Sequence, residues 1–125
     1  MPGEGLKILL VDDEKHFADT LAARLEMRGF EVRTAYNGLE ALAAIAVPAD
    51  VAVLDLRMPG MDGLEVLHEF KQRTPEMQVI ILSGHVDDKE EQAAYAAGAL
   101  SVLRKPLHID ELLDIIHTIR KTEES

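Results

Sequence analysis

The sequence of 125 residues contains no cysteine and no tryptophan, and aromatic residues make up only 4% of it. Without cysteine the chain can form no disulfide, no thiolate metal site and no cysteine nucleophile. Basic residues are also scarce, because 13 Lys and Arg stand against 23 Asp and Glu, for a net charge of -10. Nucleic acid and anionic membranes both require a basic face, so we expect this chain to bind neither directly.

Long apolar segments are absent as well. No stretch is apolar over the roughly 18–20 residues that a transmembrane helix requires. Residues 1–5 lack the basic start and the apolar stretch of a signal peptide. We therefore expect one cytoplasmic domain that spans residues 1–125. Its core is predicted over about residues 6–120, between loose termini at 1–5 and 121–125.

Short apolar runs recur along the chain and predict the strands of a sheet. Four of them are apolar almost throughout and stop at a polar residue, which is typical of strands covered on both faces. A fifth run, residues 31–35, alternates apolar and polar side chains and predicts an edge strand. The four continuous runs are residues 6–11, 51–54, 79–82 and 99–103.

Amphipathic patterns fill the gaps between these runs and predict helices. The patterns cover residues 14–28, 38–46, 62–70, 87–97 and 109–119. Asp62 is the predicted N-cap of the third helix. In the second helix, the side chains predicted to face the core are those of Leu39, Leu42, Ala43 and Ala46. Strand and helix alternate five times, which indicates an α/β domain with a parallel sheet and right-handed crossovers.

Polar residues follow the apolar runs where the predicted strands end. In an open parallel sheet, ligands bind at the carboxyl ends of the strands. Carboxylates that meet there repel one another, and a divalent cation such as Mg²⁺ removes that conflict. A lysine and a hydroxyl in the same pocket complete a cradle for phosphoryl oxygens, so the set indicates phosphoryl transfer to a carboxylate. The residues in question are Asp12, Asp13, Asp55, Ser83 and Lys105.

Four motifs, in this order, resemble the response-regulator receiver domain, the chemotaxis-type module of two-component signalling. They are residues 11–13 (VDD), 55–63 (DLRMPGMDG), 83–84 (SG) and 105–106 (KP). The resemblance extends over nearly the whole chain and implies a flavodoxin-like (βα)5 three-layer sandwich with a parallel sheet of order 2-1-3-4-5. It also implies a phosphoacceptor that switches its interaction surface, and not an enzyme.

The resemblance gives the motif residues specific roles. It implies that Asp55 is the phosphoacceptor, which receives its phosphoryl group from a sensor histidine kinase or a histidine phosphotransfer protein. Ser83 and Lys105 are expected to bind the phosphoryl oxygens. The implied ligands of Mg²⁺ are Asp12, Asp13, Asp55 and the backbone carbonyl of Arg57.

Further positions acquire expectations from the same family. Pro59 and Gly63 are expected to shape the turn after the acceptor, and the peptide bond before Pro106 is expected to be cis. Arg57 and His85 are expected to line the access route and to set the lifetime of the aspartyl phosphate.

One position departs from the family pattern. Three residues before the lysine, the family commonly has an aromatic ring that turns inward on activation, and here that residue is Val102, preceded by Ser101. The switch is therefore expected to depend more on Ser83 and the loop after it. The fourth helix, fifth strand and fifth helix are expected to contact a downstream effector, a fused output domain or a second copy, with Tyr95 as a candidate contact.

The same motifs also have other interpretations. The acidic pair at residues 12–13 would, in isolation, be a turn and a helix cap. A Mg²⁺-dependent aspartyl phosphatase typically has a second Asp two residues after the nucleophile, where this chain has Arg57. An unphosphorylated receiver-like scaffold would not need the acidic residues and the lysine. Ser83 and His85 lack the Gly-x-Ser-x-Gly setting of a hydrolase.

Overall fold

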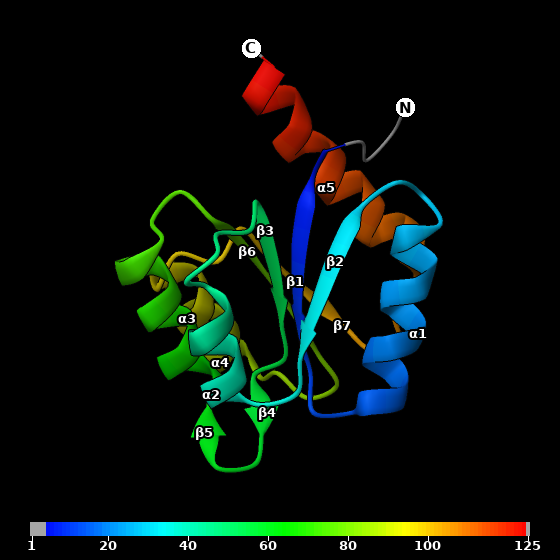
Figure 1. Cartoon of the computed structure of the whole chain (residues 1–125). Coiled ribbons are helices and arrows are strands. Elements are labelled where there is room, and N and C mark those ends of the chain that lie inside the picture. Colours follow the sequence, from blue (N-terminus) through cyan, green and yellow to red (C-terminus); the bar gives the residue numbers. More distant parts are fainter. Residues whose placement is uncertain (1–4, 125) are drawn as a thin grey trace.

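The computed structural model describes residues 5–124, and side chains over residues 5–119. Within them, a five-stranded parallel sheet lies between two groups of helices (Figure 1). The strands of this sheet are β1 (Lys7–Val11), β2 (Glu31–Ala35), β3 (Val51–Leu54), β6 (Gln78–Ser83) and β7 (Ser101–Arg104). Their order is β2-β1-β3-β6-β7, so the predicted 2-1-3-4-5 order and the edge position of residues 31–35 are confirmed.

Helices cover both faces of the sheet, which completes the predicted three layers. The helices are α1 (Lys15–Glu26), α2 (Gly38–Ala44), α3 (Gly63–Arg73), α4 (Asp88–Ala96) and α5 (Ile109–Glu124). Figure 1 shows α1 and α5 on one face and α2, α3 and α4 on the other. Each face has its own core, one centred on Leu25 and Leu112 and the other on Leu67 and Phe70. Of the residues expected to be loose, 1–4 and 125 lie outside the described residues, whereas residues 121–124 continue helix α5.

The register of the parallel strands aligns their carboxyl ends. Val11, the last residue of β1, pairs with Leu54 at the end of β3, and Leu54 in turn pairs with Ile81 of β6. Ser83 at the end of β6 pairs with Arg104 of β7. The residues that directly follow these pairs therefore meet at one edge of the sheet, where an α/β fold binds its ligands.

The segment after β3 forms a small hairpin, where the sequence predicted only a turn. β4 (Arg57–Met58) pairs in antiparallel fashion with β5 (Met61–Asp62). Gly60 lies at the tip with φ +82°, a conformation that L side chains rarely adopt. At Gly63 a Cβ atom would lie 2.3 Å from the Cα atom of Leu56, so only glycine allows this close approach of α3 to the chain after β3. The hairpin thereby fixes the backbone that follows Asp55.

The buried face of α2 differs from the predicted one. Leu39 is 75% exposed, and Ala43 and Ala46 are exposed too. The side chains buried in the core are Ala41 and Ile45, and of the four predicted residues only Leu42 packs against the core, partly buried. The reason is the start of the helix, because a Cβ atom at position 38 would lie 2.0 Å from the Sδ atom of Met61. This contact turns the glycine, and the residues one and two turns after it, towards the core.

A pair of substitutions tests this account of α2. The side chain of Asn37 caps the helix, because its Oδ1 accepts a hydrogen bond from the backbone N–H of Glu40 at 2.8 Å. We expect Asn37→Ala to lower the free energy of unfolding by about 1 kcal/mol. Leu39→Ala should change it by less than about 0.5 kcal/mol, because an exposed leucine loses little on truncation. Urea unfolding measures both, and a larger loss for Leu39→Ala would contradict the observed helix orientation.

Candidate functional site

The strand ends bring three carboxylates together. Candidate ligand oxygens of Asp12, Asp13 and Asp55 lie within 4.8 Å of one another. Asp12 and Asp55 are 2% and 4% exposed, whereas Asp13 is exposed. A cleft of about 690 Å³ opens beside this cluster, and its lining includes Asp13, Asp55, Ser83 and Lys105. The residues that the sequence analysis grouped from separate strands therefore share one site.

The carboxylate of Asp55 is held in a fixed orientation. Its Oδ1 accepts one hydrogen bond from Ser83 Oγ at 2.9 Å and another from the backbone N–H of Arg57 at 3.0 Å. Ser83 is fully buried, and its position at the end of β6 directs the hydroxyl towards β3. Oδ2 of Asp55 lies 3.6 Å from Lys105 Nζ. This arrangement presents a buried carboxylate to the cleft with a hydroxyl and an ammonium beside it.

The ammonium of Lys105 is the main positive charge inside the acidic cluster. Its Nζ lies 2.8 Å from Oδ2 of Asp12 and 2.5 Å from Oε1 of Glu14, and 4.6 Å from the centre of the Phe17 ring. Burial alone would lower the pKa of Lys105, but its bonds to Asp12 and Glu14 and the charge of Asp55 outweigh burial and raise it. Lys105 therefore stays charged throughout the physiological range. The contact with Glu14 was not predicted from the sequence. The peptide bond between Lys105 and Pro106 is cis.

Burial raises the pKa of Asp12 above its ordinary value, and the charge of Asp55 adds to that rise. The hydrogen bonds from Lys105 and from the backbone N–H of Glu14 offset only part of it. Buried carboxylate oxygens that repel one another are the donor set that a hard divalent cation prefers. The described side chains therefore fit Mg²⁺ at this edge of the sheet, because their donors are carboxylate oxygens and because a cation would stabilise the buried charge of Asp12.

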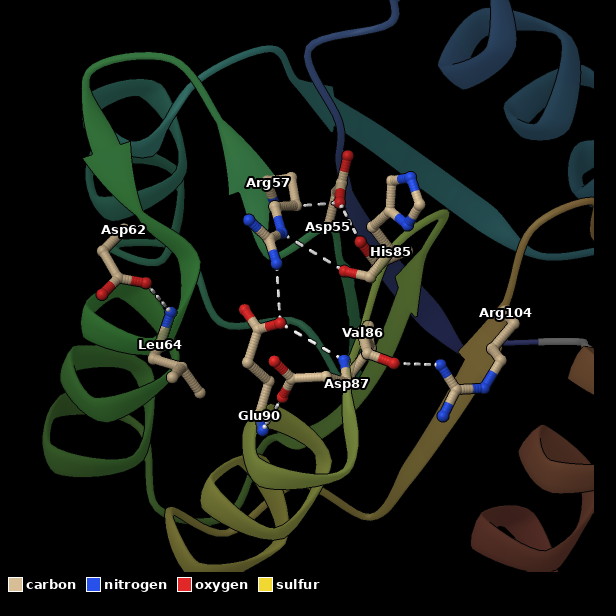
Figure 2. Close-up of polar contacts among 10 residues, drawn as sticks. Asp55, Arg57, Asp62, Leu64, His85, Val86, Asp87, Glu90 and Arg104 are labelled. Atoms are coloured by element: carbon tan, nitrogen blue, oxygen red, sulfur yellow. Dashed lines mark hydrogen bonds and ion pairs between the residues drawn. The ribbon is translucent and has the colours of Figure 1, made fainter.

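Arg57 makes two contacts beside the cleft, where an access route was expected from the sequence. Its Nε donates to the carbonyl of His85 at 3.2 Å, and its terminal nitrogen pairs with Oε1 of Glu90 at 2.7 Å (Figure 2). Arg57 and His85 both line the cleft. Glu90 could not be assigned from the sequence, because its place in the first turn of α4 gives no separate signal.

The remaining predicted positions lie around this centre. Pro59 occupies the exposed tip of the β4–β5 hairpin. Val102 is half-buried against the core, and its backbone N–H donates to Oη of Tyr95 at 3.2 Å. Tyr95 of α4 and Leu100, which directly precedes β7, are 46% and 40% exposed, so both present apolar area to solvent. Within residues 5–119, the aromatic position of the family thus carries an aliphatic side chain outside the cleft lining.

Comparison with known proteins identifies the family. A model of the response regulator receiver domain matches residues 8–117. The DNA-binding transcriptional regulator NtrC of Salmonella typhimurium is 41% identical over 110 residues, which are 87% of this chain and 24% of NtrC. A receiver protein of Anaeromyxobacter is 40% identical, with 46% of its length covered. The chain thus spans less than half the length of these curated relatives.

Solved structures agree with the sequence relatives. The CheY-like receiver domain of Methanospirillum hungatei superposes with a TM-score of 0.90 at 30% identity, covering 95% of this chain and 97% of that one. A Burkholderia pseudomallei response regulator solved with a phosphorylated aspartic acid, a calcium ion and citrate gives a TM-score of 0.85 at 28% identity. It matches 96% of this chain and 73% of its own.

None of the helices described over residues 5–124 has the length and apolar character needed to cross a membrane.

The family model covers most of the chain, and the relatives and the solved structures agree in sequence and in fold. The chain therefore belongs to the response regulator receiver domain family, the phosphoacceptor modules of two-component signalling.

Proposed function

We propose that Asp55 accepts a phosphoryl group from a phosphohistidine of a partner kinase or phosphotransfer protein, and that this transfer switches the surface of the domain. The observation that supports the proposal is the setting of Asp55. Its carboxylate is buried at the strand edge, beside the acidic pair, the hydroxyl of Ser83 and the ammonium of Lys105. Each of these groups has a task in phosphoryl transfer to a carboxylate.

The transfer forms one bond and breaks another. A carboxylate oxygen of Asp55 attacks the phosphorus, the new P–O bond forms, and the P–N bond of the phosphohistidine breaks. The imidazole nitrogen keeps the electron pair and takes up a proton. Ser83 Oγ and Lys105 Nζ donate hydrogen bonds to the phosphoryl oxygens, which stabilises the charge that they carry.

A bound Mg²⁺ would neutralise charge on the carboxylates and on the phosphoryl oxygens. The residues that would hold it are Asp12, Asp13, Asp55 and the backbone carbonyl of Arg57. In its absence, Lys105 offsets part of the charge of Asp12. The domain therefore assists its own phosphorylation, and its own dephosphorylation, by positioning groups and not by turning over a substrate of its own.

The output is proposed to pass through the surface formed by α4, β7 and α5. Tyr95 and Leu100 are exposed there, as a contact surface requires. Because the curated relatives are longer than this chain, the partner is proposed to be a downstream effector, an output domain of the same protein or a second copy. Direct contact with nucleic acid by this domain is not proposed, since its net charge is -10. We place it in the cytoplasm, as expected from the sequence.

Intact-mass measurement after incubation with acetyl phosphate tests the proposal. The protein should gain the mass of one phosphoryl group in Mg²⁺ and none in EDTA. Peptide mapping should locate the group on Asp55, and hydroxylamine should remove it, because acyl phosphates react with this nucleophile. A group on another residue would overturn the assignment of Asp55, and the absence of any adduct would favour a receiver-like scaffold.

The affinity for Mg²⁺ should depend on pH through Asp12. A protonated carboxyl group is a poor metal ligand. The affinity for Mg²⁺ therefore has its full value above the pKa of Asp12 and decreases as the pH falls through that pKa. The groups that face Asp12 are Lys105, Glu14, Asp13 and Asp55. An exposed aspartate titrates around pH 3.9. Because the pKa of Asp12 is raised, the affinity for Mg²⁺ should begin to fall at a higher pH than this as the solution is acidified. A titration followed by NMR measures this, and constant affinity down to about pH 4 would contradict it.

A further inference from the structure

Two arginines hold the start of α4 from opposite sides. Arg57, from the chain after β3, binds the carbonyl of His85 and the carboxylate of Glu90. Arg104, at the end of β7, binds the next carbonyl along the chain, that of Val86. Arg104 also pairs with the next carboxylate along the helix, that of Glu91. Figure 2 shows the two guanidinium groups on either side of the loop that leads into α4.

The two arginines, with the contacts they make to the start of α4, form a clamp whose two sides are Arg57 and Arg104. These two sides differ in their relation to the cleft. Arg57 and Glu90 both line the cleft that contains Asp55, whereas Arg104 and Glu91 are not part of its lining as the structure describes it. The backbone N–H of Arg57 already donates to Asp55. Only one of the two arginines therefore lies at the place where a phosphoryl group on Asp55 would add charge.

The pair between Arg57 and Glu90 is weak enough to exchange. The side chain of Arg57 is 57% exposed and that of Glu90 is 26% exposed. Exposed pairs of this kind favour the closed arrangement by only about two- to fivefold. An aspartyl phosphate carries more negative charge than one carboxylate, and its oxygens accept two parallel hydrogen bonds from a guanidinium. The phosphoryl group would therefore compete successfully for Arg57.

Glu90 can lose Arg57 without ending the helix. Its Oε1 also accepts a hydrogen bond from the backbone N–H of Asp87 at 3.3 Å, and the side chain of Asp87 accepts one from the backbone N–H of Glu90 at 2.8 Å. This capping box keeps the first turn of α4 formed. Loss of the arginine would remove only the link between α4 and the loop after β3.

From these contacts we propose that Arg57 gives up its ion pair with Glu90 and binds the phosphoryl group on Asp55 instead. Until the phosphoryl group is transferred, the ion pair with Glu90 keeps the arginine at α4. The exchange releases one side of the clamp while Arg104 keeps the other, so α4 can shift about its Arg104 side. Tyr95 on the same helix bonds to Val102 of β7, and a shift of α4 would reach the proposed output surface there. This inference rests on the proposed phosphorylation of Asp55, and it gives the switch a route without an aromatic residue at position 102.

The test compares Glu90→Gln with Glu91→Gln. Each substitution removes one negative charge from the first turn of α4 and leaves an isosteric amide. Each of the two glutamates lies 2.7 Å from its arginine. A glutamine side chain at position 90 can still complete the capping box, so the fold of α4 is preserved. The two variants thus share the change in charge and differ in which arginine is released. Because Glu90 lines the cleft and Glu91 does not, the signal of Arg57 must be measured beside the rate.

Phosphorylation by acetyl phosphate is first verified by intact mass in both variants. The rate of phosphorylation should rise about two- to fivefold in Glu90→Gln, because Arg57 is no longer held by its carboxylate, and should change little in Glu91→Gln. The NMR signal of the Arg57 Nε–H should shift on phosphorylation in the wild type and in Glu91→Gln. In Glu90→Gln it should differ from the wild-type position before the donor is added, and it should still move on phosphorylation, because only then does the guanidinium gain a phosphoryl partner.

The outcomes separate this inference from the function on which it rests. If no adduct forms on Asp55 in the wild type, the proposed function itself fails. If the adduct forms but the Arg57 signal does not move, or if both variants change the rate equally, the exchange is wrong and the phosphoacceptor role stands.

Discussion

Replacement of Asp55 by asparagine should abolish phosphorylation. The amide has no nucleophilic carboxylate oxygen, so transfer from acetyl phosphate should fall by at least about a hundredfold, to the background of the measurement. Intact-mass analysis in Mg²⁺ gives the extent of phosphorylation for the variant and the wild type side by side. An adduct of equal size in both proteins would exclude Asp55 as the acceptor.

The loss should not come from unfolding. The amide oxygen of the Asp55→Asn variant would still accept the hydrogen bonds from Ser83 Oγ and from the backbone N–H of Arg57. The charge of Asp55 contributes to the raised pKa of Asp12, so its removal relieves repulsion in the cluster. We therefore expect Asp55→Asn to melt no lower than the wild type. Asp62→Asn is the matched control, because asparagine also caps α3 and the change lies outside the cluster, and it should be phosphorylated normally.

The parts of this structure that could be predicted from sequence are those that a local pattern determines. Continuous apolar runs mark strands covered on both faces, and the polar residue that ends each run marks the binding edge. The motifs around Asp55 and Lys105 then resemble one family, which supplied the strand order. The alternating pattern of residues 31–35 predicted the edge position of β2, whereas the continuous run at residues 99–103 gave no sign that β7, which is only partly buried, is the other edge strand.

The parts that could not be predicted depend on contacts between distant segments. The buried face of α2 is set by the approach of Gly38 to Met61, and an apolar pattern in which alanines are common does not distinguish one face from another. The ion pair of Arg57 with Glu90 links residues 33 positions apart. Long charged side chains have many rotamers of similar energy, so their partners appear only once the backbone is placed.

The geometry of the cluster indicates that Lys105 and a divalent cation would compete for Asp12. In the structure its ammonium lies 2.8 Å from Asp12 and 3.6 Å from Asp55, so it is closer to the proposed metal ligand than to the proposed acceptor. Glu14 offers it a third carboxylate at 2.5 Å. A divalent cation on Asp12 would repel the ammonium, which would then lie between Glu14 and the phosphoryl site. On the proposed function, the lysine would thus be a counter-ion before metal binding and a phosphoryl ligand after it.

Lys105→Met should therefore move two measurements in opposite directions. Methionine keeps much of the apolar stem beside the Phe17 ring but removes the charge, so Mg²⁺ affinity at pH 8 should rise at least about tenfold. Phosphorylation at saturating Mg²⁺ should nevertheless slow by about 10²–10³-fold, because the phosphoryl oxygens lose a charged donor. Calorimetric titration gives the affinity and intact mass against time gives the rate. Lys15→Met removes an equal charge that lies over the Tyr36 ring, and it should change neither quantity by more than about twofold. If Lys105→Met instead weakened Mg²⁺ binding, the ammonium would be supporting the metal site and not competing with it.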